Sequence, residues 1–245
     1  MMQLTRNQFP APVLESDSIL RFAPLAWLKL QFFCHAGHTE IGGFGISAED
    51  DPLYVEDFVT VRQQVTALTV RFADEAVSDF FDRCVDAGLK PQRFARIWCH
   101  THPGASVVPS SRDEETFSKS FGCCDWALMF ILGRTGQTYA RLAFSAGPGG
   151  ALLLPTAADW AAWPEWISAG NGRLEAQVAQ WQQEYMENIH LLPALTASPA
   201  LAERLEDTAE DWWETYPYHS ELDEVTYGLA ETDYPLAAAD RTPPF

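Results

Sequence analysis

The first third of the chain contains one segment whose hydrophobic positions have helical spacing, followed by two segments with the composition of strands. Apolar residues recur at roughly helical spacing from Leu25 to Phe33, and Pro24 stands at the position where a helix tolerates proline best. Gly37 follows as the expected helix end. Segments 41–46 (IGGFGI) and 53–61 (LYVEDFVTV) read as strands, and the turn-forming SAEDDP separates them. These positions predict a helix followed by two paired strands.

The clearest helix of the sequence comes next. Apolar residues recur at i, i+3, i+4, i+7 and i+8, namely Val77, Phe80, Phe81, Cys84 and Val85. This spacing is the stripe of an amphipathic helix, which we expect to end at Gly88.

Three further apolar segments predict strands. FARIWC (94–99) leads directly into His100, and DWALMFILG (125–133) is continuous enough for a strand buried on both faces. TYARLAF (138–144) alternates as its partner after a turn at 135–136. A further helix is expected between the strands at 94–99 and 125–133, and this order of elements fits an α/β fold.

Beyond Pro155 the character of the sequence changes. Residues 174–189 (LEAQVAQWQQEYMENI) and 200–214 (ALAERLEDTAEDWWE) are helical candidates, and an irregular tail is expected from Tyr216. Residues 1–155 carry 17 acidic and 13 basic side chains, net −4, whereas residues 156–245 carry 17 acidic and 3 basic, net −14. We therefore predict a catalytic domain over 14–155 and an acidic helical extension and tail over 156–245.

Composition narrows the classes of partner and compartment. A formal charge of −18 disfavours nucleic acid, because phosphate binding needs clustered Lys and Arg, and makes a basic protein partner easier to imagine. The longest apolar run, Trp126–Leu132, is far shorter than the roughly 20 residues of a membrane helix, and the first residues contain no apolar leader core. We expect a cytoplasmic protein that binds no membrane.

The cysteines are expected to be buried free thiols. Their number is odd, they lack the C-x-x-C spacing of metal and redox motifs, and they lie in apolar or periodic segments. The five are Cys34, Cys84, Cys99, Cys123 and Cys124.

Candidate chemistry is concentrated in the segment HTHPGASVVPSSRD. His100 and His102 are two residues apart at the end of a predicted strand, so both imidazoles face the same side and can converge on one ion. Ser111 and Glu114 match an S-x-x-E capping box, which would begin a helix with Asp113 in its first turn.

Two histidines and a carboxylate leave the fourth position of a tetrahedral zinc to water, as in catalytic sites. A separate base must then take the proton of the attacking water, and the non-ligand carboxylate of Glu40 is the candidate. Each feature alone also has an ordinary structural interpretation: an H-x-H on a strand, a helix cap and an acidic turn residue are all common. We interpret the histidines without such partners as structural, namely His35, His38, His190 and His219.

Together these residues resemble the JAMM (MPN-plus) metalloprotease family, whose pattern is an early glutamate, then H-[ST]-H-P, then S-x-x-D. Here the parts are Glu40 in EIGGFG, His100-Thr101-His102-Pro103 and Ser110-Ser111-Arg112-Asp113. The resemblance covers about residues 14–155 and implies an α/β sandwich with a curved mixed sheet between helices.

The same resemblance implies roles for individual residues. His100, His102 and Asp113 would bind Zn²⁺, Glu40 would be the general acid/base, and Ser110 would donate to the oxyanion of the tetrahedral intermediate. All three metal ligands of the family pattern are present, which disfavours an inactive scaffold.

The implied activity is cleavage of a peptide or isopeptide bond after the C-terminal glycine of a ubiquitin-like modifier. Partners would be that modifier or its conjugates, together with activating and conjugating enzymes of the same pathway. Unlike large eukaryotic members, this chain has little sequence between the Asp113 helix and the strand at 125, which favours a compact, prokaryotic-type enzyme. Two alternatives stay open: a protease that processes sulfur carriers or small peptides, and a partner-binding module with a secondary metal site.

Overall fold

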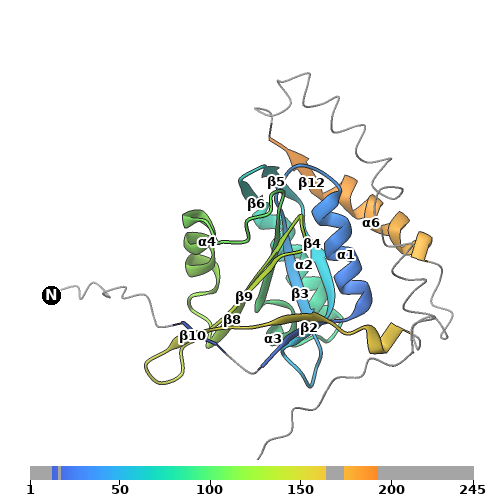
Figure 1. Cartoon of the computed structure of the whole chain (residues 1–245). Coiled ribbons are helices and arrows are strands. Elements are labelled where there is room, and N and C mark those ends of the chain that lie inside the picture. The colour runs from blue at the N-terminus through green and yellow to red at the C-terminus, as the bar shows by residue number, and fades with distance from the viewer. Residues whose placement is uncertain (1–12, 16–17, 164–173, 193–245) are drawn as a thin grey trace, which may run out of the picture. The chain divides into compact units, whose positions relative to one another are not determined.

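A mixed β-sheet with helices on its two faces forms the fold (Figure 1). The computed structural model describes residues 13–15, 18–163 and 174–192. Within these residues the larger sheet has the strand order β1-β10-β9-β8-β7-β3-β4-β2-β11. Its strands are β1 (Val13–Glu15), β2 (Leu20–Phe22), β3 (Ile41–Ser47), β4 (Tyr54–Thr60), β7 (Ile97–His102), β8 (Trp126–Gly133), β9 (Thr138–Phe144), β10 (Gly150–Leu153) and β11 (Thr156–Ala158).

Parallel and antiparallel pairs are mixed in this sheet. β7 and β8 run parallel, whereas β3 runs antiparallel to both β4 and β7. β3, β7 and β8 are buried almost throughout, because helices cover both faces of the sheet. Gly43 of β3 illustrates the close fit, since a Cβ there would lie 2.4 Å from the carbonyl oxygen of Val59.

One face of the sheet is covered by α1 (Pro24–His35), and α6 (Leu174–Asn188) packs on the outside of α1. Because α1 lies between the sheet and α6, most of its circumference is buried. Trp181 of α6 packs against Phe32 of α1 with ring centroids 5.9 Å apart.

The opposite face carries α2 (Asp74–Asp86), the short α3 (Pro91–Phe94) and α4 (Ser111–Phe121). Their aromatic side chains form one core with the strands, and Phe44 of β3 stacks on Phe80 of α2 at a centroid distance of 5.1 Å. In α2 only Phe80 and Cys84 are buried, while the predicted stripe residue Val85 is exposed near the helix end.

A second, three-stranded sheet stands beside the first, in the order β12-β5-β6. β5 (Gln63–Thr66) and β6 (Thr69–Phe72) form a hairpin, and β12 (Ile189–Leu191) adds to β5 in parallel. The pairing of β12 with β5 therefore joins residues 126 positions apart in the sequence, as the pair Gln63 and Ile189 shows.

Most predicted elements are present at nearly the predicted positions. The helix from Pro24, the two strands after it, the amphipathic helix before Gly88 and the strands at 126–133 and 138–144 are confirmed. The prediction of a strand from Phe94 was wrong by three residues, because Phe94 ends α3 and the strand begins at Ile97. Gly88 has φ +80°, a backbone conformation that favours glycine and ends α2.

Part of the predicted extension after Pro155 is packed against the rest of the chain. β11 pairs with β2, β12 pairs with β5, and α6 contacts α1. Lys29 of α1 is buried and forms a 2.7 Å ion pair with Glu184 of α6. The predicted helix at 174–189 is confirmed, whereas the candidate at 200–214 and the tail lie outside the described residues.

These contacts predict different outcomes for two truncations. Deleting residues 193–245 leaves every contact described above, so metal binding and stability should be retained. Deleting 174–245 also removes Trp181 and should cost at least the roughly 3–5 kcal/mol that truncating one buried aromatic costs. Urea unfolding of both truncated proteins against the full chain measures this, and equal midpoints for all three would show that α6 is not part of the folded core.

Within the described residues, no helix combines the length and apolar character needed to cross a membrane.

Candidate metal centre

Two histidines end the central strand β7. His100 and His102 both lie on the same side of the strand, because side chains alternate with a period of two. His100 is 0 % exposed and its ring stacks on Trp98 at a centroid distance of 4.4 Å. The two imidazole centroids are 5.1 Å apart, so the predicted convergence of His100 and His102 is confirmed.

Asp113 faces these histidines from the first turn of α4. The N-cap is Ser110, whose hydroxyl oxygen accepts a hydrogen bond from the Asp113 backbone N–H at 3.2 Å. In return the Ser110 N–H donates to Asp113 Oδ2 at 2.7 Å, which completes a capping box. The helix cap thereby fixes the direction of the Asp113 carboxylate.

The predicted capping box of Ser111 and Glu114 was wrong by one residue. Ser111 is the first helical residue, and Glu114 turns instead to Arg141, with two N–O distances of 2.7 Å. Both S-x-x-acid pairs satisfy the sequence pattern, but only the Ser110 pair leaves an acidic side chain that also faces β7. The helix start and the place of Asp113 in its first turn are as predicted.

The three side chains form a buried group that could hold a metal ion. Each of His100, His102 and Asp113 offers one potential metal-ligand atom, and these three atoms lie within 4.8 Å of one another. His100 Nε2 is 3.5 Å from Asp113 Oδ1, and His102 Nε2 is 3.8 Å from Asp113 Oδ2. These separations exceed those of good N–H···O hydrogen bonds.

Unpartnered nitrogen atoms are the observation that fits a metal best. His100 Nδ1, His100 Nε2 and His102 Nε2 are buried without a hydrogen-bond partner. Leaving such polar atoms unpaired is costly, and folded proteins rarely do so without a reason. Two imidazoles and a carboxylate are common ligands of divalent transition metals.

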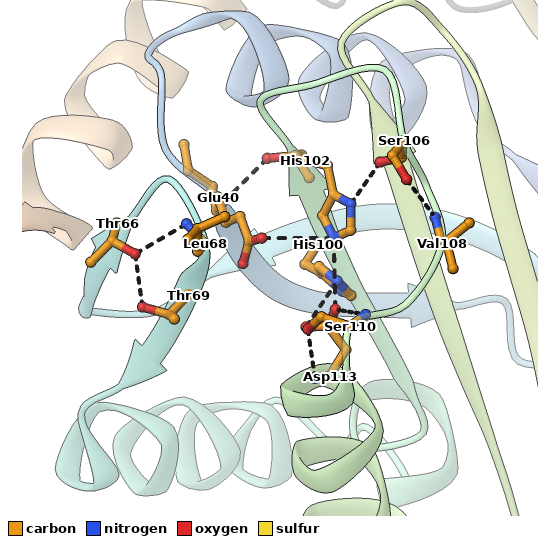
Figure 2. Close-up of polar contacts among 12 residues, drawn as sticks. Glu40, Thr66, Leu68, Thr69, His100, His102, Ser106, Val108, Ser110 and Asp113 are labelled. Atoms are coloured by element: carbon orange, nitrogen blue, oxygen red, sulfur yellow. Dashed lines mark hydrogen bonds and ion pairs between the residues drawn. The ribbon is translucent and has the colours of Figure 1, made fainter.

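The orientation of His102 is set by a backbone carbonyl. Its Nδ1 lies 2.8 Å from the carbonyl oxygen of Ser106, in the loop that follows β7 (Figure 2). A neutral His102 in this arrangement donates its Nδ1 hydrogen to the carbonyl and keeps the Nε2 lone pair for the centre. Outer hydrogen bonds of this kind orient the histidine ligands of metal sites.

The charges of the group also suit a cation. Burial raises the pKa of Asp113, but the neighbouring His100 and His102 rings outweigh burial and hold that pKa well below its usual range. Burial lowers the pKa of His100, so its ring is neutral at pH 7. Burial also acts to lower the pKa of His102, yet Asp113, the Ser106 carbonyl and Glu40 together raise it.

Glu40 lies at the edge of this group, immediately before β3. Its Oε1 is 3.8 Å from His102 Nε2 (Figure 2). Its backbone N–H donates to the carbonyl oxygen of Thr66 at 2.9 Å. The side chain is only 8 % exposed, and burial raises the pKa of Glu40 to about 7 despite the opposing charge of His102. A carboxyl group with this pKa can both accept and return a proton near neutrality.

The structure brings together all five residues that the sequence analysis selected. Ser110 takes part through the cap of α4, although its position is exposed. Sequence reasoning missed Thr66 and Ser106, which act through backbone carbonyls and therefore leave no signal in residue type.

The other histidines lie apart from the metal group. His35 Nδ1 contacts the Gln31 carbonyl, His38 lies beside Arg134, and His190 is exposed on β12. His219 lies outside the described residues.

The prediction of buried cysteines holds for Cys34, Cys84 and Cys99, all of them free thiols. It was wrong for Cys123, which is exposed, and Cys124 is partly exposed. Both follow the end of α4 in the short turn before β8, where the chain runs along the surface.

Comparison with known proteins adds no relative to this geometry, since neither the protein-family models nor the curated proteins contain a match to the chain.

Proposed function

We propose that this chain is a zinc-dependent hydrolase of the JAMM type, with the corresponding α/β sandwich, that cleaves after the C-terminal glycine of a ubiquitin-like modifier. The observation that carries the proposal is the buried group of His100, His102 and Asp113, with unpartnered imidazole nitrogens and a further carboxyl group beside it. In a purely structural zinc site, protein side chains would supply all four ligands. Here three side chains converge, and the carboxyl group of Glu40 lies beside them outside the ligand group.

His100, His102 and Asp113 are the residues that would hold the zinc ion. When bound, zinc in such a site polarises a carbonyl group and lowers the pKa of water to about 7. The donor set supports zinc, because two imidazole nitrogens and one carboxylate oxygen match its ligand preferences.

Glu40 would move the proton. Its carboxylate lies beside His102 but outside the ligand group, so it can take a proton from the attacking water. The raised pKa means that Glu40 can carry this proton and release it to the departing amine. The bond between its backbone N–H and the Thr66 carbonyl holds the Glu40 backbone beside the group.

Ser110 would stabilise the developing negative charge. Its hydroxyl oxygen accepts from the Asp113 N–H, which leaves the hydroxyl hydrogen to be donated outward. The exposed position of Ser110 at the N-terminus of α4 makes this hydrogen accessible to a substrate carbonyl oxygen. Donors aimed at such an oxygen contribute strongly to acyl-transfer catalysis.

The proposed substrate is an extended tail that ends in glycine. The group lies where β7 ends and beside the hairpin β5–β6, so a peptide can be held there by backbone hydrogen bonds. Residues beside the scissile bond must be small, since Glu40, His102 and Asp113 are packed closely around the reacting position.

A fluorogenic amide of ubiquitin tests the proposal. The zinc-loaded full chain should release the fluorophore from the natural glycine tail and lose this activity when the last glycine is replaced by valine. The control is the Glu40→Gln protein with the same zinc content. Equal cleavage of both tails would indicate a general peptidase, and no cleavage of either by the zinc-loaded protein would argue against a ubiquitin-like substrate.

A further inference from the structure

A buried glutamine connects the hairpin to the strand that begins after Glu40. Gln63, the first residue of β5, is 1 % exposed. Its side-chain oxygen accepts a hydrogen bond from the Gly42 N–H at 2.9 Å, and its side-chain nitrogen donates to the Gly42 carbonyl at 2.7 Å. The same nitrogen also donates to the Val61 carbonyl at 2.9 Å. One amide side chain thus binds β3 as a neighbouring strand would.

Only an amide side chain of this length suits these contacts. The backbone of Gly42 presents one donor and one acceptor, and both must be paired because they are buried. A carboxylate would offer no donor, and an aliphatic side chain would offer neither group. Gly42 also permits the close approach, since a Cβ there would lie 3.0 Å from both Phe72 and Val70 of β6.

Gly42 stands between the two parts of the candidate site. It is two residues after Glu40, and it is the direct neighbour of the metal-ligand candidate His100 across the β3–β7 pair. The hairpin holds the same stretch at a second point, where the Thr66 carbonyl accepts the Glu40 N–H. Glu40 is therefore fixed by β5 on one side and, through Gly42, aligned with β7 on the other.

Elements from the C-terminal part of the described chain, α6 and β12, help to hold Gln63 in position. β12 pairs with β5 at Gln63 itself, through Ile189. The preceding helix α6 is tied to β4, where Asn188 donates to the Thr60 carbonyl at 3.1 Å and Glu184 accepts from the Thr60 N–H at 2.9 Å. The position of Gln63 is thus set by elements on both of its sides.

We infer that Gln63 is a positioning residue for Glu40: its amide fixes Gly42 and thereby holds the Glu40 carboxylate beside His102. This role rests on the proposed function, because Glu40 matters only if it transfers protons there. Gln63 itself is not one of the metal-ligand candidates.

The first test needs no substrate. Gln63→Met keeps a side chain of similar length without the amide, and Gln63→Glu keeps the acceptor for Gly42 while removing the donor. In the zinc-loaded full chain, both should increase hydrogen exchange at the Glu40 and Gly42 amides, with zinc content unchanged. Gln64→Leu, at the exposed neighbouring position, is the matched control. Wild-type protection of these amides in a folded Gln63→Met or Gln63→Glu protein would overturn the inference.

The second test separates positioning from general stability. With the ubiquitin amide, Gln63→Met should lower kcat by roughly 10- to 100-fold and leave KM nearly unchanged, as expected for a displaced catalytic group. In a Glu40→Gln background the same substitution should have almost no further effect, because the group that it positions is gone. Independent, multiplicative losses would overturn the inference. If wild type does not cleave the amide, the proposed function fails, while hydrogen exchange still decides whether Gln63 holds Glu40.

Discussion

Replacing any one of His100, His102 and Asp113 by alanine is expected to abolish both metal binding and hydrolysis. Among the residues that the structure describes, three side chains converge, so each loss leaves two ligands. Outer-shell substitutions already weaken metal binding about 10- to 100-fold, and a lost ligand should weaken it more. Metal analysis of the purified proteins should give about one zinc per chain for wild type and background for the variants.

Stability provides an independent measure of the same loss. A ligand at about 1,000 times its Kd stabilises a protein by about 4 kcal/mol. In a chain of this length that corresponds to a Tm change of roughly 8–16 °C, at about 2–4 °C per kcal/mol. A chelator should therefore lower the Tm of wild type and leave that of the alanine variants unchanged.

His190→Ala is the matched control, because this exposed histidine lies on β12 and outside the metal group. It should keep both the zinc and the response to chelator. Full zinc occupancy in the Asp113→Ala protein would contradict the assignment of Asp113 as a ligand.

The candidate site could be predicted because its determinants are local in the sequence. His100 and His102 share a face through the strand period, and a helix start predicted within one residue places Asp113 in the first turn. The capping box was displaced because two serines in succession each have an acidic residue three positions later. Choosing between them requires knowing that Asp113 faces β7, which is a tertiary contact.

The hairpin β5–β6 could not be predicted because its stability is not local. Each strand has only four residues, and the hairpin pairs with β12 across more than a hundred residues. The hairpin is bonded to β3 through the side chain of Gln63. No pattern of residue types predicts that a glutamine side chain will take the place of a neighbouring strand. The boundary predicted at Pro155 rests on a change in charge along the sequence. The positions of β11, α6 and β12 depend instead on tertiary contacts with elements before Pro155, which composition does not reveal.

Glu40→Gln should separate chemistry from metal binding. The substitution keeps size and the backbone bond to Thr66 but removes the group that accepts a proton. Because Glu40 lies outside the ligand group, zinc content should stay at the wild-type value. Turnover of the ubiquitin amide should fall by about 10²- to 10⁴-fold, the range that general acid–base groups contribute.

Because Glu40 is buried, the Glu40→Gln variant can separate a loss of activity from a loss of stability. Burial raises the pKa of Glu40 to about 7, so the wild-type side chain is partly protonated near neutrality and a neutral amide fits the same surroundings. We therefore expect the Tm of the Glu40→Gln protein to match or exceed that of wild type. Glu49→Gln, at an exposed site, is the control and should change neither zinc content nor turnover. A Glu40→Gln protein that turns over at the wild-type rate would exclude Glu40 as the proton carrier, whereas one that loses its zinc would make Glu40 a fourth ligand.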